Sequence, residues 1–96
     1  VDEKIRLFYW KNQQQEEVDF VIKESLKVKQ LIQICFNIDN LETKNREIRA
    51  LIKAGKELKC SDLLIITEDT EKEEKEEWFG DKATITYVPL WKWLLA

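Results

Sequence analysis

The sequence predicts one mixed α/β domain, in which a β-sheet packs against a single long crossover helix and the chain ends in a short C-terminal helix. Three patterns predict this architecture. Short segments before residue 40 are rich in branched and aromatic side chains with period-two alternation, as in strands. An amphipathic helical repeat follows over residues 40–59, and residues 63–66 form a continuous apolar run, which is typical of a buried strand reached by a crossover connection.

The first two strands are expected at residues 5–11 and 18–22, separated by a polar break that suits a hairpin loop. Alternate residues of the second segment are apolar and are expected to share one face of the sheet; they are Val18, Phe20 and Ile22. Asp19 is therefore expected to point away from the side that carries Phe20.

A third strand is expected over residues 28–38. Gln33 and Cys35 lie two residues apart on one of its faces. The other face is apolar and carries Ile32, Ile34, Phe36 and Ile38. A mostly apolar strand with an amide on one face is typical of a central strand beside a polar pocket.

The long helix is expected to run from residue 40 to about Lys59. Either Asp39 or Asn40 can cap its N-terminus, and Asp39 with Glu42 three residues later fits the spacing of a capping box. Together with the strands on either side of it, this helix forms one βαβ unit.

The last third of the chain combines an acidic segment with a strand and a short helix. Residues 68–77 hold seven acidic residues and two lysines, so a solvated loop or hairpin end is expected there. A strand is expected at residues 84–88, and Pro89 is expected to begin a short helix at residues 90–95.

Length and composition favour a single domain over residues 1–96. Apolar residues make up 44% of the chain, with two glycines and one proline, which gives core-forming material and few flexible linkers. No segment has the uninterrupted apolar length of a membrane helix and no signal segment is recognisable, so we expect a cytoplasmic protein without a membrane partner. The start at Val1, without Met, indicates a fragment of a longer protein.

Two cysteines and no histidine exclude a structural zinc site, which needs about four Cys or His ligands. Cys35 and Cys60 are expected to be buried or half-buried free thiols. Gly55 and Gly80 stand alone, so the chain has no Gly-rich phosphate-binding loop, and any ATPase activity must lie elsewhere.

Polar residues on two adjacent expected strands match the frame of a metal-dependent nuclease. Such nucleases use two acidic groups on neighbouring strands to hold Mg²⁺ and a nearby lysine to orient the attacking water. Asp19 lies on one strand, and Gln33 and Cys35 share one face of the next. These three side chains are expected to point toward a common polar patch.

At these positions the sequence resembles the PD-(D/E)XK nuclease superfamily, in particular the C-terminal domain of unknown function attached to archaeal and bacterial AAA+-type ATPases. The resemblance implies a restriction-endonuclease-like core and an upstream ATPase module as partner. The segments that carry it cover most of the chain and are Leu7-Phe8-Tyr9-Trp10-Lys11, Glu17-Val18-Asp19-Phe20-Val21-Ile22, Leu31-Ile32-Gln33-Ile34-Cys35-Phe36, Arg46-Glu47-Ile48-Arg49-Ala50-Leu51, Leu64-Ile65-Ile66-Thr67 and Pro89-Leu90-Trp91-Lys92-Trp93-Leu94-Leu95.

Residue by residue, the resemblance places Asp19 at the metal-binding aspartate and Gln33 at a glutamate that is sometimes glutamine. Cys35 replaces the motif lysine, and neither a thiol nor a thiolate supplies a permanent positive charge beside a scissile phosphate. The glutamate of the superfamily's first helix would lie upstream of Val1. The pattern therefore indicates a decayed active site, with Mg²⁺ held at Asp19 only if nuclease activity survives.

Each candidate also has a plain structural interpretation. Asp19 could be a strand carboxylate bonded to the backbone or to a basic side chain, and Gln33 could be a satisfied buried amide. Glu47 falls at the edge of the apolar face of the helix, where it could complete a polar site with Asp19 and Gln33 or pair with an arginine.

Two surfaces are candidates for partner binding. Basic residues recur along one side of the long helix, where a DNA backbone could lie unless Glu42 and Glu57 neutralise them. These basic residues are Arg46, Arg49, Lys53 and Lys56. The Trp-rich segment at residues 90–95 is expected either to complete the core or to dock another domain or a second copy, forming a homo-oligomer.

The sequence therefore predicts a degenerate nuclease-fold accessory domain of an archaeal-type ATPase, acting in regulation or in DNA or protein binding. The alternative is a weakly active Mg²⁺-dependent DNA endonuclease, which would need metal at Asp19 and a substitute for the missing lysine.

Overall fold

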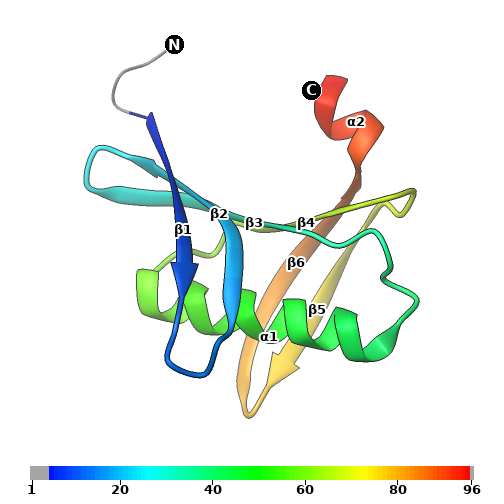
Figure 1. Cartoon of the computed structure of the whole chain (residues 1–96), viewed down its shortest axis with the longest axis horizontal. Helices are drawn as coiled ribbons and strands as arrows, with labels where there is room; N and C mark the ends of the chain where they lie inside the picture. The colour runs from blue at the N-terminus through cyan, green and yellow to red at the C-terminus, as the bar shows by residue number, and fades with distance from the viewer. Residues whose placement is uncertain (1–4, 96) are drawn as a thin grey trace.

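The computed structural model describes residues 5–95, so the expectations about Val1 and about a glutamate upstream of it lie outside the described residues. This part of the chain forms six strands and two helices (Figure 1). In chain order they are β1 (Ile5–Lys11), β2 (Glu17–Glu24), β3 (Lys27–Ile34), α1 (Leu41–Leu58), β4 (Leu63–Thr67), β5 (Lys72–Trp78), β6 (Asp81–Pro89) and α2 (Leu90–Leu95). Neither helix is long and apolar enough to cross a membrane.

The strands form one mixed sheet in the order β1-β2-β3-β4-β6-β5. The first three strands are antiparallel neighbours, whereas β3, β4 and β6 run parallel, and β5 pairs antiparallel with β6 at the far edge. The α1 helix connects the parallel neighbours β3 and β4. The prediction of a mixed sheet with one long crossover helix and a short C-terminal helix is therefore confirmed.

Each face of the sheet carries its own apolar cluster. The α1 helix crosses one face, and its buried stripe packs on strand residues such as Leu31 and Ile65 (Figure 1). Ile32, Leu64 and Ile66 form a smaller cluster on the opposite face. Full burial of one such side chain contributes about 1.5–3 kcal/mol, so the α1-covered face, which holds most of the buried residues, supplies most of the stabilisation.

A bulge in β2 changes which residues share a face. The pairing advances three residues on β2, from Val18 to Val21, while β1 advances by two. Val18 and Val21 consequently both lie in the α1-covered core, whereas Phe20 and Ile22 belong to the opposite cluster. The prediction that Val18 shares a face with Phe20 and Ile22 is wrong, because strict alternation cannot anticipate an extra residue.

The connection from β3 to α1 also differs from the expectation. The strand expected over residues 28–38 ends at Ile34, and the Cys35 N–H then donates a hydrogen bond to the Ile66 carbonyl (2.9 Å). Asn40 caps α1, since its side-chain oxygen accepts a hydrogen bond from the Thr43 N–H (3.0 Å).

The acidic segment, expected to be a solvated loop or hairpin end, contains the edge strand β5, which pairs antiparallel with β6. Its residues pair one for one with β6, from Lys72 opposite Tyr87 to Trp78 opposite Asp81. An edge strand tolerates this composition because its charged side chains remain in water, and the Glu76 carboxylate accepts a hydrogen bond from the buried Tyr87 hydroxyl (2.8 Å). The acidic composition therefore gave no sign of β5, which forms because its backbone pairs with β6.

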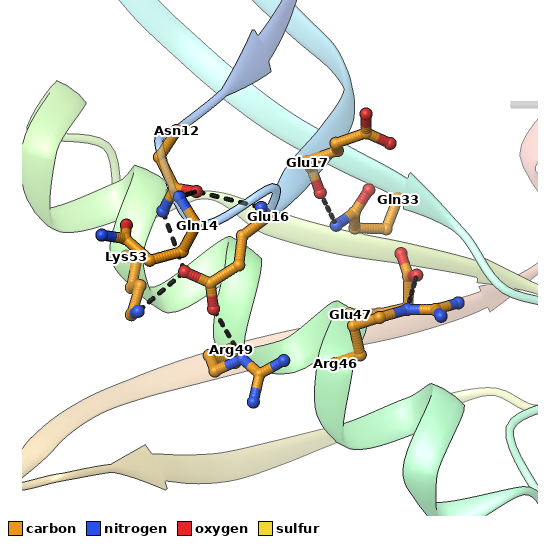
Figure 2. A network of polar contacts seen from close by, with 9 residues as sticks. All are labelled: Asn12, Gln14, Glu16, Glu17, Gln33, Arg46, Glu47, Arg49 and Lys53. Carbon is orange, nitrogen blue, oxygen red and sulfur yellow. Dashed lines mark hydrogen bonds and ion pairs between the residues drawn. The ribbon is translucent and has the colours of Figure 1, made fainter.

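A buried carboxylate joins the β1–β2 hairpin to α1 (Figure 2). Glu16, in the hairpin loop, is buried and lies 2.7 Å from the Lys53 ammonium and 2.5 Å from Arg49 Nε. Asn12 donates a further hydrogen bond to it from its side-chain amide (2.8 Å). Burial alone would raise the pKa of Glu16, but the Asn12 and Lys53 hydrogen bonds and the two cations outweigh burial and hold its pKa below the ordinary value.

Replacing Glu16 with Gln is expected to lower the free energy of unfolding at neutral pH by about 1–3 kcal/mol, because two cations would lose their carboxylate. The contribution of Glu16 is present above its unfolded-state pKa of about 4.3 and is lost as pH falls through the lower folded-state pKa. Urea unfolding from neutral pH to about pH 3 should therefore show the two proteins converging. Glu68→Gln, an equal charge change at an exposed residue, is the control and should behave like the wild type.

Candidate functional site

The Gln33 amide links two backbone groups of β2 beside the bulge. Gln33 is completely buried; its Oε1 accepts a hydrogen bond from the Asp19 N–H (2.9 Å) and its Nε2 donates one to the Glu17 carbonyl (2.7 Å). Figure 2 shows the amide reaching the Glu17 main chain. The side chain thereby replaces β2–β3 ladder bonds where the backbone pairing ends at Phe20 and Ile32. Of the two interpretations of Gln33, the structure supports the satisfied buried amide.

The Asp19 carboxylate is also bonded to the backbone. Its Oδ2 accepts a hydrogen bond from the Ile34 N–H (2.8 Å), at the last residue of β3. Asp19 and Gln33 thus bridge β2 and β3 in both directions, each side chain contacting the backbone of the other strand. One carboxylate oxygen and both amide heavy atoms are engaged in holding the sheet together.

Cys35 lies next to this bridge, where the motif would have its lysine. The thiol is buried and free. Burial raises its pKa, and the negative charge of Glu47 raises it further; the Asn37 backbone and Arg46 oppose this by less, and Asp19 adds the smallest increase. Cys35 is therefore a neutral thiol at neutral pH and supplies neither a cation nor a thiolate. Cys60, at the other end of α1, is also a buried free thiol.

Glu47 extends from α1 into a hollow of about 280 Å³ that Asp19 also lines. The remaining lining residues are Gln15, Glu16, Glu17, Arg46 and Ala50. Burial raises the pKa of Glu47, and the Asp19 charge raises it further, whereas Arg46, with its Nε 3.6 Å from a Glu47 oxygen, lowers it. The structure thus brings Asp19, Cys35 and Glu47 together on the α1 side of the sheet. Gln33 is completely buried, and its amide is bonded to the β2 backbone.

Only two carboxylates of this site, those of Asp19 and Glu47, could hold a Mg²⁺ ion, and Glu47 pairs with Arg46. Magnesium requires near-octahedral oxygen coordination, usually with one or two carboxylates and several waters. Here Gln33 is committed to the backbone and Arg46 pairs with Glu47. Among residues 5–95, no group of three or more Cys, Asp or Glu side chains is arranged to hold a metal ion.

The four basic residues predicted to form a DNA-binding stripe on α1 each contact an acid of the same chain. Arg49 and Lys53 contact the buried Glu16, and Lys56 lies 3.2 Å from Asp81. Arg46 contacts Glu47, as described above. The pairing acids are not the expected Glu42 and Glu57, and Glu57 instead accepts a hydrogen bond from the Trp10 indole (2.6 Å).

The C-terminal helix α2 leaves most of its apolar side chains in water. Leu90 packs against the smaller cluster. Trp91 is 61% exposed, and Trp93, Leu94 and Leu95 are also exposed. Of the two interpretations of this segment, core packing is wrong for these four residues, because α2 projects from the end of β6 beyond the sheet (Figure 1).

The sequence did not single out Glu16 or Glu17 as members of this site. Both lie between the first two expected strands, where composition indicates only a loop. The one available signal was the spacing of Arg49 and Lys53, which places two cations on the same side of successive helical turns. That spacing suggests that an acidic residue lies beside Arg49 and Lys53, but it does not identify Glu16 as that residue.

No known protein family model matches the chain, and no curated protein matches it significantly in sequence.

Replacing Gln33 with Glu, the residue common in active nucleases, is expected to destabilise the domain by about 2–4 kcal/mol. A carboxylate cannot donate to the Glu17 carbonyl, and it would bring a charge into a fully buried position. Chemical denaturation measures the loss. Gln14→Glu, an equal change at an exposed loop residue, should cost under about 0.5 kcal/mol, and equal losses for the two variants would contradict the bridging role.

Replacing Glu47 with Gln is expected to stabilise the domain at neutral pH. Because the folded-state pKa of Glu47 is raised, its stabilising contribution is present below the unfolded-state pKa and is lost as pH rises through the folded-state pKa. The amide removes that ionisation cost, so the variant's advantage should appear at neutral pH and vanish at about pH 4. Thermal unfolding at both pH values checks this, with the exposed Glu42→Gln as the matched variant. A lower stability of Glu47→Gln at neutral pH would show that the Arg46 pair dominates.

Proposed function

We propose that this domain is a nuclease-like accessory module that no longer cleaves DNA and acts by binding a protein partner. The observation that carries the proposal is the commitment of Gln33 and Asp19 to the backbones of β2 and β3. These are the positions that the resemblance assigns to metal ligands. With the neutral Cys35 thiol in place of lysine, the site has lost the groups that activate water and stabilise phosphate charge.

A protein partner is favoured over DNA by the distribution of charge and apolar surface. DNA binding draws its affinity from cations that are free to contact phosphates. The four cations of the predicted stripe on α1 contact Glu16, Glu47 and Asp81, and the chain has a net charge of −3. The exposed Trp91 and Trp93 on α2 instead provide aromatic surface typical of protein contacts. The resemblance proposes an upstream ATPase module as that partner, with regulation as the outcome.

The second candidate, a weak Mg²⁺-dependent endonuclease, is favoured by one feature. Asp19, Glu47 and Arg46 line the same hollow, so Arg46 could replace the missing lysine if it left Glu47. A metal bound by Asp19 and Glu47 would compete with Arg46 for Glu47. This competition is measurable.

Incubation of labelled linear and branched DNA with the chain and Mg²⁺ or Mn²⁺ is expected to give no cleavage above background, because Gln33 is bonded to the backbone, Arg46 pairs with Glu47, and a thiol replaces the motif lysine. The melting temperature should be equally insensitive to either metal, since binding to the folded state would raise it. Asp19→Asn tests the site and Asp69→Asn, an exposed residue, is its control. Metal-dependent cutting that Asp19→Asn abolishes and Asp69→Asn preserves would establish the endonuclease instead.

A further inference from the structure

The two edges of the sheet differ in how they are protected from pairing with another strand. The edge strand β5 has the sequence Lys-Glu-Glu-Lys-Glu-Glu-Trp, and its charges discourage the approach of a second strand. The opposite edge, β1, has the sequence Ile-Arg-Leu-Phe-Tyr-Trp-Lys (Figure 1). Leu7 is 62% exposed and Tyr9 is 56% exposed, and Ile5 and Phe8 are also exposed.

We propose that β1 is the binding site for β1 of a second copy of this chain, so that antiparallel pairing joins two sheets into one. One edge of β1 pairs with β2 and the other has no strand beside it within residues 5–95. Such an edge presents a row of backbone donors and acceptors to any extended chain. The extra residue of the bulge lies in β2, so β1 itself has no inserted residue that would interrupt pairing along its free edge.

A second copy fits this edge because the β1 sequence is complementary to itself. With the two-fold axis at Phe8, all seven residues of one β1 find a partner on the other, and residues directly opposite lie about 4.5–5.5 Å apart at Cβ. Leu7 then lies beside Tyr9 of the second copy. Each cation faces an uncharged residue, with Arg6 opposite Trp10 and Lys11 opposite Ile5. Pairing of β5 with itself would instead gather its four glutamates from each copy.

Charge complementarity supports the same register. The pairing of β1 with β2 places Phe8 opposite Val21 and Trp10 opposite Val18, and both valines belong to the α1-covered core. Arg6 lies two residues before Phe8 and therefore shares that face. In the dimer its guanidinium reaches the Trp10 indole of the second copy, which is bonded to the Glu57 carboxylate (2.6 Å). The two-fold axis produces this contact twice, each time between Arg6 of one copy and Trp10 and Glu57 of the other.

Light scattering and sedimentation equilibrium of the 11.5 kDa chain over a concentration series test the proposal. We expect a monomer–dimer equilibrium with Kd in the micromolar range, about −8 kcal/mol. Arg6→Glu should raise Kd by about tenfold or more, because it places an acid against Glu57 of the second copy. Lys75→Glu, an equal charge change on the opposite edge, should leave Kd unchanged, with circular dichroism confirming that both variants fold.

The predicted register is tested by Phe8→Cys, which places two thiols on the two-fold axis. Oxidation at a protein concentration near the measured Kd should yield a covalent dimer, whereas Leu26→Cys, at a 93% exposed turn residue, should remain monomeric. A chain that stays monomeric throughout the concentration series would overturn the proposal. So would a dimer that survives Arg6→Glu and is lost in Trp91→Asp, because α2 would then be the interface. If Arg6→Glu leaves the dimer Kd unchanged, pairing through β1 is wrong. That result does not bear on the absence of DNA cleavage, which the DNA assay tests separately.

Discussion

Gln33 is the residue on which the rest of this domain depends. Its backbone pairs with Ile65 in the parallel part of the sheet, while its amide holds Glu17 and Asp19 in the antiparallel part. One residue thus joins three strands at the point where the sheet changes direction. Because Gln33 is completely buried, each bond it makes satisfies a group that would otherwise cost about 1–3 kcal/mol.

The same residue shapes the candidate site. The β2–β3 backbone pairing ends at Phe20 and Ile32, and beyond that point the Gln33 amide bonds to the Asp19 N–H and the Glu17 carbonyl. A glutamate could accept from the Asp19 N–H but could not donate to the Glu17 carbonyl. The bridge between β2 and β3 therefore depends on an amide at position 33. Glu47 and Asp19 are left facing one hollow, where their like charges make the ionisation of Glu47 unfavourable.

The features predictable from sequence are those with a long period or a distinct boundary signal. The amphipathic repeat of α1, the apolar run of β4 and Pro89 before α2 each specify an element without reference to the rest of the chain. Strand parity placed Asp19 on the side away from Phe20, where it lines a hollow with Glu47, but it did not anticipate that Gln33 bonds to the β2 backbone or that β3 ends before Cys35. The β2 bulge was not anticipated either, because an inserted residue leaves the local alternation of side chains intact while reversing their faces.

Two further features depended on tertiary partners rather than on local pattern. The strand β5 exists because β6 supplies its hydrogen bonds, and its acidic composition alone is equally suited to a loop. Glu16 becomes buried only when α1 brings Arg49 and Lys53 to the hairpin. Such long-range ion pairs can be recognised only once the fold is known. The sequence shows which charged residues are present, but it does not show which of them pair with one another.

The pattern of neutralised charges explains what kind of surface remains. Arg49, Lys53 and Lys56 attach α1 to the hairpin and to Asp81 at the start of β6, so cations that the sequence offered to a phosphate backbone contribute to folding instead. The exposed surface includes the charged edge strand β5 on one side of the sheet and aromatic residues of β1 and α2 elsewhere. An acidic edge repels nucleic acid, and an aromatic edge strand is suited to another polypeptide. The ion pairs along α1 are therefore the reason why the proposed function assigns this domain a protein partner and not DNA.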